Sequence, residues 1–412
     1  MLDIRFIREN PDKVRDGCRK RQVNADIDGL LAVDKKRRKL LQEAEELKAK
    51  RNKFSKTKPD EKIIKKVKVI GEKIKELNEQ LRKIENEYIE KLSELPNMPA
   101  DDVAAGGEEN NKVIRTFGKK PGFGFNSKDH IELVTDLKLV DYKRAAKMSG
   151  AGFWCYTGRG ALIEWALLNY FVDFHNKNKY YFILPPYLLN EQSAYASGHL
   201  PKFRDDLFWT QDKTCLNATA EMMLVNYHRD EILSQAELPK KYFAFAPSFR
   251  REAGSYRKEE RGMIRGHQFH KIEMFQFTKP GDSWQAFDEL VKNAEEMVKG
   301  IGLHYQVSQL AAGDCSTAMA KTIDIEVWIP SIGVYKEVSS ISNALDYQAR
   351  RANIRFKNSE NKNEFVHTLN ASGLATSRLV PAILEQNQQK DGSVTVPEAL
   401  RKYMDGIKKI TS

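Results

Sequence analysis

The sequence contains few cysteines and none of the motifs of the two commonest nucleotide-binding folds. Its four cysteines, Cys18, Cys155, Cys215 and Cys315, are too scattered for zinc-binding pairs or a disulfide framework. We therefore expect no zinc and a reduced, cytoplasmic compartment. The N-terminus lacks the apolar core of a signal peptide, and no apolar run reaches the length of a membrane span, so no membrane partner is expected. Neither a Gly-x-Gly-x-x-Gly fingerprint nor a P-loop is present, which argues against Rossmann and P-loop folds.

The size and charge of the chain favour two domains and an anionic partner. With 412 residues, the chain is long for one hydrophobic core, and its 41% hydrophobic content is enough for packed domains. The formal net charge of +11 makes nucleic acid the first candidate partner.

Two long helical patterns occupy the N-terminal region. Apolar residues recur every three or four positions from Leu30 to Phe54, and a cleaner seam of the same kind runs from Val67 to Tyr88. Thr57-Lys58-Pro59-Asp60 separates the two runs, because proline cannot continue a helix interior. The pattern predicts an antiparallel helical hairpin, an arm about 45–50 Å long at 1.5 Å per residue.

Positive charge is concentrated around the turn of this hairpin. Residues 48–68 contain ten Lys and Arg against Asp60 and Glu61, a local net charge of +8, whereas the lower part of the second helix is balanced. A solvated coiled coil needs charge on its outer faces, but it does not need one sign at its tip. We prefer a phosphate-binding tip over an ordinary solvated face. Because no aromatic residues alternate with the basic ones, contact would be to the nucleic-acid backbone and shape rather than to stacked bases.

The rest of the chain has shorter elements. Helical patterns cover residues 126–137 and 160–174, and short apolar strand patterns follow at 180–184, 242–246, 272–277, 323–329 and 334–339. Most of the connections are too short for repeated βαβ crossovers, so the expected fold class is α+β, with a mostly antiparallel sheet flanked by helices. We expect an N-terminal domain of residues 1–105, with its arm over about residues 27–95, and a second domain of residues 106–412.

The segment Phe249–Phe277 combines strand patterns with charges. Arg250, Glu252 and Glu273 lie in what we interpret as two strands separated by a long, charge-dense loop. A charge in a strand that faces a core is costly unless it has a partner. Either these residues form a structural ion pair, or they line a site for a polar, anionic ligand.

Four polar clusters in this domain are candidates for such a site. They are Thr219-Ala220-Glu221 before a helix expected near Met222, Arg250-x-Glu252 with Phe269 and Glu273 downstream, Glu337-Val338-Ser339-Ser340 at the expected end of a strand, and Thr368–Arg378 before the helix 379–386. Each cluster alone is weak evidence, because a helix cap, a turn or a packed helix entry would explain it.

Together and in this order, the clusters resemble the class II aminoacyl-tRNA synthetases, specifically the seryl-tRNA synthetase family. The resemblance covers essentially the whole chain, including the hairpin arm and the segments LPPYLLN, LPKFRDDLF, AKTIDIEVW and SNALDYQARR. Motif 1 of the class resembles the helix at 160–174 together with the strand that stops at Pro185-Pro186. Motif 2 resembles Phe249–Phe277, and motif 3 resembles Thr368–Gln386. The resemblance implies a homodimer with motif 1 at its interface and tRNA bound across subunits.

The resemblance also implies an activity and roles for residues. The enzyme would form seryl-adenylate from L-serine and ATP and pass the seryl group to tRNA(Ser), with tRNA(Sec) as a second candidate; the basic arm tip would bind the tRNA. Catalysis would rest on Arg250, Glu252 and Arg378. ATP binding would involve Arg250, Arg251, Glu252, Phe269, Glu337, Val338, Ser339, Ser340 and Arg378, and serine binding Thr219, Ala220, Glu221, Glu273 and Ser372. Glu337 and Ser340 would hold Mg²⁺, which prefers hard oxygen ligands.

The chain departs from the family pattern at Ala371, and also in the Thr376-Ser377 step before Arg378 and in the Leu216-Asn217-Ala218 lead into Thr219. Ala371 stands in Asn370-Ala371-Ser372-Gly373, where the family commonly has glycine, and we expect its methyl group near the bound ligand. Two alternative functions remain open: a synthetase-like paralogue that binds RNA without activating serine, and a ligase that charges carrier proteins. Retention of the charged positions argues against the first, and the arm argues against the second.

Overall fold

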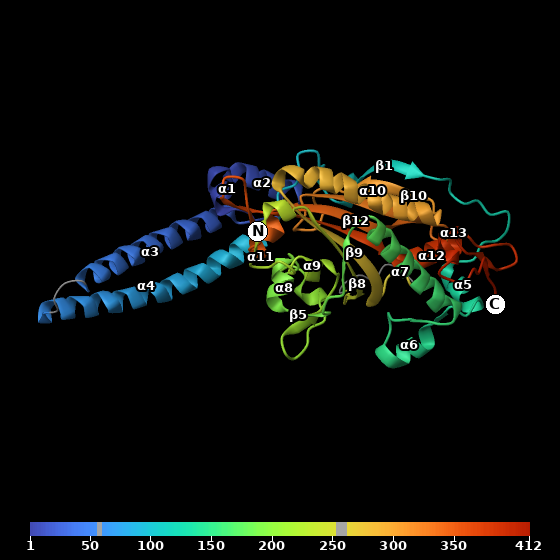
Figure 1. Ribbon diagram of the computed structural model, residues 1–412, viewed down its shortest axis with the longest axis horizontal. Helices are drawn as coiled ribbons and strands as arrows, with labels where there is room; N and C mark the ends of the chain where they lie inside the picture. The colour runs from blue at the N-terminus through green and yellow to red at the C-terminus, as the bar shows by residue number, and fades with distance from the viewer. Residues whose placement is uncertain (56–59, 253–261) are drawn as a thin grey trace. The chain divides into compact units, whose positions relative to one another are not determined.

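Two units make up the structure, a computed structural model that describes residues 1–55, 60–252 and 262–412 (Figure 1). The first unit is Met1–Met98 and the second is Pro99–Ser412. None of the helices in the described residues combines the length and hydropathy needed to cross a membrane.

The first unit consists of helices, and the predicted antiparallel arm is confirmed. Its helices are α1 (Ile4–Glu9), α2 (Pro11–Lys20), α3 (Ile27–Phe54) and α4 (Glu61–Glu94). Asp26 and Asp60 cap the N-termini of the two long helices by accepting hydrogen bonds from the Gly29 and Ile63 amides. The tip residues 56–59, including Lys56, Lys58 and most of the expected turn, lie outside the described residues.

The predicted apolar seam holds α3 and α4 together. Its buried members are Val33, Leu40, Ala44, Leu77, Leu81 and Ile84. Arg37 interrupts the seam in the sequence, and its guanidinium lies 4.9 Å from the Tyr88 ring centre and 3.4 Å from the Glu85 carboxylate. A cation over an aromatic face explains why this charge is tolerated at the seam.

The second unit is built on an eight-stranded sheet. Its strands, in spatial order, are β1 (Lys112–Phe117), β10 (Tyr305–Gln309), β11 (Lys321–Ile329), β12 (Val334–Leu345), β15 (His367–Ala375), β9 (Gln268–Thr278), β8 (Lys240–Phe249) and β4 (Tyr181–Ile183). All neighbouring pairs are antiparallel except β4 and β8. The predicted fold class, a mostly antiparallel sheet flanked by helices, is therefore confirmed.

Helices and short strands complete this unit. The helices are α5 (His130–Asp136), α6 (Tyr142–Ser149), α7 (Arg159–Lys177), α8 (Glu191–Ala196), α9 (Glu221–Leu224), α10 (Ser283–Ile301), α11 (Tyr347–Ala352), α12 (Thr376–Gln386) and α13 (Glu398–Arg401). The short strands are β2 (Val140–Asp141), β3 (Cys155–Tyr156), β5 (Leu188–Asn190), β6 (Thr214–Leu216), β7 (Ile232–Ser234), β13 (Arg355–Lys357), β14 (Asn363–Phe365), β16 (Val394–Thr395) and β17 (Lys409–Ile410).

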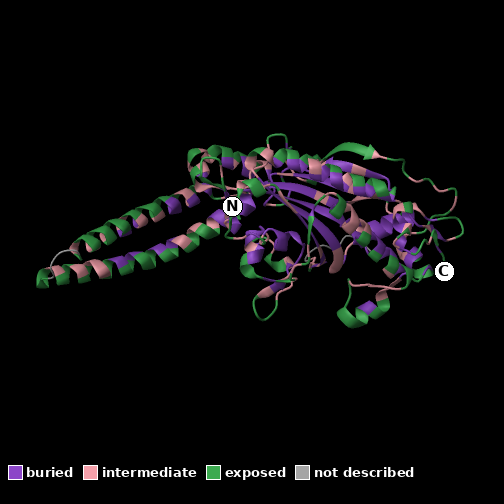
Figure 2. Ribbon diagram, viewed as in Figure 1, coloured by how far each residue is buried: buried purple, intermediate pink, exposed green. Residues whose placement is uncertain are grey.

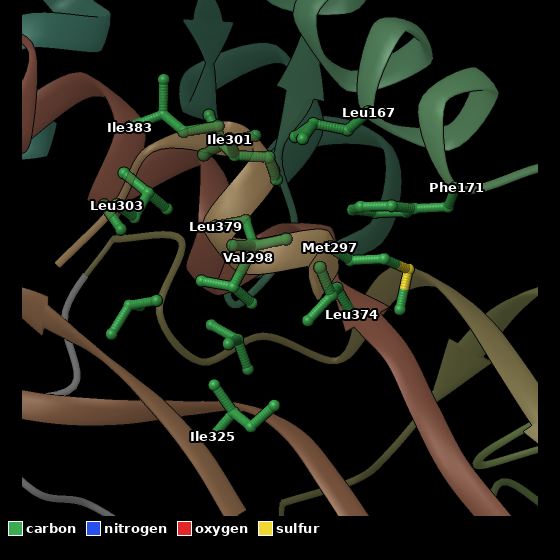
Figure 3. Packing of buried hydrophobic residues seen from close by; sticks show 14 of the residues in the cluster. Leu167, Phe171, Met297, Val298, Ile301, Leu303, Ile325, Leu374, Leu379 and Ile383 are labelled. Atoms are coloured by element: carbon green, nitrogen blue, oxygen red, sulfur yellow. The ribbon is translucent and has the colours of Figure 1, made fainter. Parts of the chain in front are cut away.

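Two hydrophobic cores lie on opposite faces of the sheet. On one face, α7, α10 and α12 pack on the strands; Figure 3 shows Leu167, Met297 and Leu379 of these helices together with Ile325 and Leu374 of the sheet. The other face packs residues of α9 and α11 against a second set of strand residues, which includes Phe275 and Phe277 of β9. The central strands are accordingly almost entirely buried (Figure 2).

Three expectations about local structure are wrong. The helix expected from Met222 onward is the single short helix α9, which is followed by turns rather than by a long amphipathic helix. Glu337–Ser340 does not end a strand, because β12 continues to Leu345. β8 ends at Phe249, so Arg250 and Glu252 lie just beyond this strand rather than inside it.

Candidate active site

The predicted site residues converge on one cavity of the second unit. It has a volume of about 460 Å³, and the predicted residues that line it are Thr219, Glu221, Arg250, Glu252, Glu273, Glu337, Ser340 and Ser372. Phe269 and Arg378 line a smaller adjoining cavity of about 40 Å³ that shares Arg250, Glu252 and Glu337. The strands β12, β15, β9 and β8, which are neighbours in the sheet, carry or precede most of these residues. Sheet topology thus brings together residues that are far apart in the sequence.

Four predicted binding residues do not line these cavities. Arg251 is exposed, and its guanidinium lies 5.9 Å from the Phe208 ring centre. Ala220 belongs to the second hydrophobic core, and Val338 to the core on the opposite face of the sheet. Ser339 is buried and donates its hydroxyl to the Ser372 carbonyl. Their sequence neighbours, rather than these residues themselves, supply the polar lining.

A β-bulge explains how Glu337 and Ser340 reach the same cavity. Residues three apart in a regular strand point to opposite faces of a sheet. In β12, Ser339 pairs with Ile325 while Glu337 pairs with the adjacent Glu326, so Val338 is an extra residue. The bulge turns the side chains on both sides of it, and such bulges are frequent next to active sites. Glu337 and Ser340 therefore both line the cavity.

Strand alternation places three residues of β9 on the cavity face. Phe269, Lys271 and Glu273 are spaced by two, so they share a face of the sheet. The Lys271 ammonium lies 2.5 Å from the Glu273 carboxylate and 3.3 Å from the Ser372 hydroxyl, and the Thr219 hydroxyl donates to Glu273 over 3.3 Å. Our sequence interpretation missed Lys271, although its spacing from Glu273 was a signal that would have found it.

Glu221 is a buried carboxylate at the cavity wall. Burial, and then repulsion by Glu273, raises the pKa of Glu221 to about 7. A hydrogen bond from the Gln348 amide, 2.6 Å long, and the charges of Lys271 and Arg250 act in the opposite direction. A cationic group placed between Glu221 and Glu273 would relieve the repulsion, so the arrangement suits an ammonium ligand.

Two guanidinium groups frame the adjoining cavity. Arg378 donates to the Glu337 carboxylate over 2.9 Å and to the Glu337 carbonyl over 2.8 Å. Burial acts to raise the pKa of Glu337. The positive charges of Arg378, Arg250 and Lys271 outweigh burial, so the pKa of Glu337 is lowered. The Arg250 guanidinium lies 5.2 Å from the Phe269 ring centre and donates to the Ala218 carbonyl over 3.3 Å.

Three ion pairs are present at the site, and they differ from the purely structural ion pair that the sequence analysis left open for Arg250, Glu252 and Glu273. Glu252 binds Arg265 at 2.5 Å, Glu273 binds Lys271, and Arg378 binds Glu337. All three pairs line the two cavities, so they present charges to a ligand rather than only joining neighbouring strands. Glu252 also has a φ of 52°, and non-glycine residues held in this left-handed region cluster at functional sites.

Ala371 does not lie where we expected it. Its side chain belongs to the hydrophobic core on the face of α7 and α12, while its neighbours Asn370 and Ser372 line the cavity. The expectation of a methyl group near the ligand is therefore wrong, because strand alternation turns it away. Gly373 is the constrained position, since a Cβ there would lie 2.8 Å from the His175 ring.

Four polar residues that our sequence interpretation missed belong to the same surroundings. Arg265, His199 and Asn370 line the main cavity, and Gln348 binds Glu221 from behind. Burial, and then the charges of Arg250, Lys271 and Arg351, lowers the pKa of His199 to about 3, so this imidazole stays neutral. Arg265, Asn370 and Gln348 lie in segments that the sequence analysis singled out, and Asn370 is spaced by two from Ser372, whereas no local pattern marks His199.

Comparison with known proteins identifies the family. Residues 203–387 match the tRNA synthetase class II core domain (G, H, P, S and T), and residues 1–99 match the seryl-tRNA synthetase N-terminal domain. The chain is 55% identical to serine–tRNA ligase 2 of Clostridium acetobutylicum over 98% of this chain and 99% of that protein. The chain belongs to the seryl-tRNA synthetase family.

Solved structures agree with this membership. The seryl-tRNA synthetase of Pyrococcus horikoshii complexed with ATP is 33% identical, with a TM-score of 0.91 over 100% of this chain and 99% of that one. The cytoplasmic serine–tRNA ligase of Naegleria fowleri in complex with AMP is 30% identical, with a TM-score of 0.88 over the same shares. The predicted family and the predicted class II core are therefore confirmed.

Proposed function

We propose that this protein is a serine–tRNA ligase. It joins L-serine to ATP as seryl-adenylate, with release of pyrophosphate, and transfers the seryl group to the 3′ end of tRNA(Ser), with release of AMP. The observation that carries the proposal is the convergence of residues from four separate segments on one cavity, in a chain that belongs to the seryl-tRNA synthetase family. The tRNA(Sec) remains a second candidate acceptor.

Charging of purified tRNA tests this proposal directly. The full-length protein, supplied with ATP, Mg²⁺ and radiolabelled serine, is expected to form acid-precipitable seryl-tRNA with tRNA(Ser), and a tRNA for another amino acid is the control. Equal charging of both tRNAs, or no charging of either, would contradict the proposal.

The nucleotide half of the cavity is assigned to Arg250, Glu252, Phe269 and Arg378. A serine carboxylate oxygen attacks the α-phosphorus while the pyrophosphate leaves, so no protein nucleophile is needed and rate depends on positioning and charge stabilisation. The Arg250 guanidinium binds the α-phosphate, because a planar fork suits phosphoryl oxygens. Phe269 and Arg378 lie on either side of the purine ring, and Glu252 accepts from its amino group.

The serine half is assigned to Thr219, Glu221, Glu273 and Ser372. Glu221 binds the ammonium of serine with help from Thr219, and Glu273 accepts from the serine hydroxyl, with Ser372 beside it. Alanine is rejected because it would leave a buried carboxylate without its hydroxyl partner. The close contacts of Thr219, Glu273 and Ser372 within this cavity support the assignment.

The cavity also has oxygen groups that fit Mg²⁺. Glu337 and Ser340 face it from the bulge of β12, and Asp324, the cross-strand partner of Ser340, has a buried Oδ1 with no hydrogen-bond partner in the described part of the chain. Among the described residues there is no cluster of three or more His, Cys, Asp or Glu that could hold a metal by itself. This agrees with a magnesium ion that takes most of its ligands from phosphates and water. When bound, Mg²⁺ would neutralise phosphate charge; Glu337 and Ser340 would hold it.

The basic tip of the arm is assigned to tRNA binding. Lys48, Lys50, Lys53, Lys62, Lys65, Lys66 and Lys68 are all exposed near the ends of α3 and α4. Such charges favour binding of phosphates, and the affinity should fall with salt. Removal of the arm should abolish efficient charging of tRNA while adenylate formation continues; equal loss of both activities would contradict a separate role.

We assign the active form as a cytoplasmic homodimer with motif 1 at its interface and tRNA bound across the subunits. Trp165 of α7 and Tyr181 of the edge strand β4 are 59% and 65% exposed, and Leu184, beyond β4, is 68% exposed. Exposed apolar side chains on and near a strand at the edge of the sheet suit a second copy of the chain. Sedimentation should give twice the chain mass of 47.3 kDa, and Trp165→Glu should give monomers; a monomeric native protein would contradict the assignment.

A further inference from the structure

Gln348 makes three side-chain hydrogen bonds that fix the orientation of its amide. The side chain is 1% exposed, and its Nε2 donates to the Glu221 carboxylate over 2.6 Å and to the Ser197 carbonyl over 2.9 Å. Its Oε1 accepts from the Thr368 hydroxyl over 2.7 Å. Since an N–H must face Glu221 and the oxygen must face Thr368, the amide cannot flip without losing these bonds.

The charges around Glu221 make this hydrogen bond consequential. Glu221 is 7% exposed and faces the like charge of Glu273 on β9, while Lys271 of β9 and Arg250 beyond β8 supply the nearby positive charges. Burial is the largest of the influences that raise the pKa of Glu221 to about 7. A buried carboxylate in this position tends to take up a proton, and a protonated Glu221 could not attract an ammonium group.

We propose that Gln348 is a positioning residue for serine: its amide favours the ionised form of the Glu221 carboxylate and fixes it toward the cavity, where the ammonium of serine binds. The inference rests on the proposed function, in which Glu221 binds that ammonium. Gln348 itself touches no substrate. It acts through Glu221, and Thr368 holds it in place from the opposite side.

A neutral amide suits this role better than a cation. A lysine or arginine in the same place would pair with Glu221 permanently and compete with the incoming ammonium. An amide N–H stabilises the carboxylate and leaves the charge available, since a hydrogen bond to an ionised group is stronger than one between neutral groups. A glutamine at position 348 therefore suits a Glu221 carboxylate that must bind the positively charged ammonium of serine.

The test compares two glutamine-to-methionine variants of the full-length protein. Q348M keeps the length of the side chain and removes all its hydrogen bonds. Q386M is the matched control, because the amide of Gln386 also makes three hydrogen bonds, to His304 N, His304 O and Trp328 O, and Gln386 does not line the cavity. In serine-dependent ATP–pyrophosphate exchange, Q348M should raise KM for serine about 10–100-fold and leave KM for ATP within about twofold.

A pH profile separates positioning from a merely structural role. For Q348M, the pH below which kcat/KM for serine declines should rise by about one unit, because Glu221 loses the donor that favours its ionised form. Q386M should leave both the KM values and the profile unchanged. If Q348M is poorly folded by circular dichroism, T368V replaces it. That change removes only the hydroxyl that orients the amide, and it should shift serine KM in the same direction by about threefold.

E221Q makes failure of the inference distinguishable from failure of the proposed function. If E221Q leaves serine KM unchanged, the assigned role of Glu221 is wrong and the proposed serine site fails. If E221Q weakens serine while Q348M and T368V do not, or if Q348M raises both KM values without moving the pH profile, only the inference about Gln348 is overturned. In the E221Q background, Q348M should add less than about twofold to serine KM, because the two residues act as one unit.

Discussion

The Lys271 ammonium lies 2.5 Å from the Glu273 carboxylate on the cavity face of β9. Both side chains are almost fully buried. Removing one member of such an ion pair leaves the charge of the other buried and uncompensated. Because Glu273 also receives the Thr219 hydroxyl, it is held at a fixed place beside Ser372. The pair thus presents a preorganised carboxylate to a small polar ligand.

Replacement of Glu273 with Ala should therefore weaken serine far more than ATP. Loss of a polar partner for a substrate hydroxyl is expected to cost about 100-fold or more in kcat/KM for serine, with KM for ATP changed by less than about threefold. ATP–pyrophosphate exchange at varied serine and ATP concentrations measures both. Glu289→Ala is the control, since it breaks the Lys241–Glu289 pair, also a close Lys–carboxylate pair, outside the cavity. Retention of normal serine dependence in Glu273→Ala would refute the assignment.

Serine binding should depend on pH through Glu221. Its pKa is raised to about 7, so the ionised form predominates above this pH and is lost as pH falls through it. KM for serine should rise about tenfold for each unit of pH below 7, while KM for ATP stays flat. Steady-state exchange between about pH 5.5 and 8.5 measures this. A serine KM that is constant over that range would contradict the account.

The same raised pKa has a consequence for stability. The folded protein holds the proton on Glu221 more tightly than the unfolded chain does, so ionisation of Glu221 above the unfolded pKa opposes folding. Glu221→Gln should raise the free energy of unfolding by about 1–3 kcal/mol at pH 8, and the gain should shrink as pH falls toward the unfolded pKa near 4.5. Urea denaturation at pH 8 and near the unfolded pKa measures this difference in the free energy of unfolding. If Glu221→Gln is less stable than the unchanged protein at pH 8, the charge of Glu221 is already compensated in the folded state.

Glu337 and Ser340 should set the magnesium requirement. Ser340→Ala removes one oxygen ligand and should raise the Mg²⁺ concentration for half-maximal exchange by roughly tenfold, and Glu337→Gln should raise it further. Ser308→Ala is a suitable control, since its hydroxyl binds the Glu326 carboxylate on a neighbouring strand and does not line the cavity. An unchanged Mg²⁺ requirement in both site variants would exclude these residues as ligands.

Neutral substitutions at the arm tip should affect only the tRNA step. Replacement of Lys62, Lys65 and Lys66 with Gln should lower kcat/KM for tRNA by about 10–100-fold at physiological salt and reduce its salt dependence. Serine-dependent exchange without tRNA should remain normal. The same triple change at Lys73, Lys75 and Lys83, exposed lysines farther along α4, serves as the control. Equal effects of the two triple variants on charging would argue against a localised contact.

The sequence predicts the fold class from local patterns, whereas the site residues are predicted from the resemblance of four clusters, taken together and in order, to a known family. The apolar seams predict α3 and α4, and alternating patterns predict β9 and β11. The bulge at Val338 is different, since it depends on the pairing of β12 with β11 and leaves no mark in the sequence. Strand pairing likewise decides that Ala371 faces the core rather than the ligand.

Positions that depend on tertiary packing could not be predicted. Gln348 reaches Glu221 across 127 residues of sequence separation, and although it lies in the segment SNALDYQARR, nothing in that segment shows which side chain it contacts. The helix expected after Glu221 ends within one turn and is followed by turns, although its apolar residues are buried in the second core. Residues 253–261, which form most of the long loop expected before His267, lie outside the described residues.

The most direct test of the central claim is ATP–pyrophosphate exchange by the full-length protein with each protein amino acid supplied singly. The account predicts that serine alone supports fast exchange, with alanine slower by at least about 100-fold because Glu273 would then lack its hydroxyl partner. Exchange that is as fast with alanine or another amino acid as with serine, or no exchange with serine at all, would contradict it.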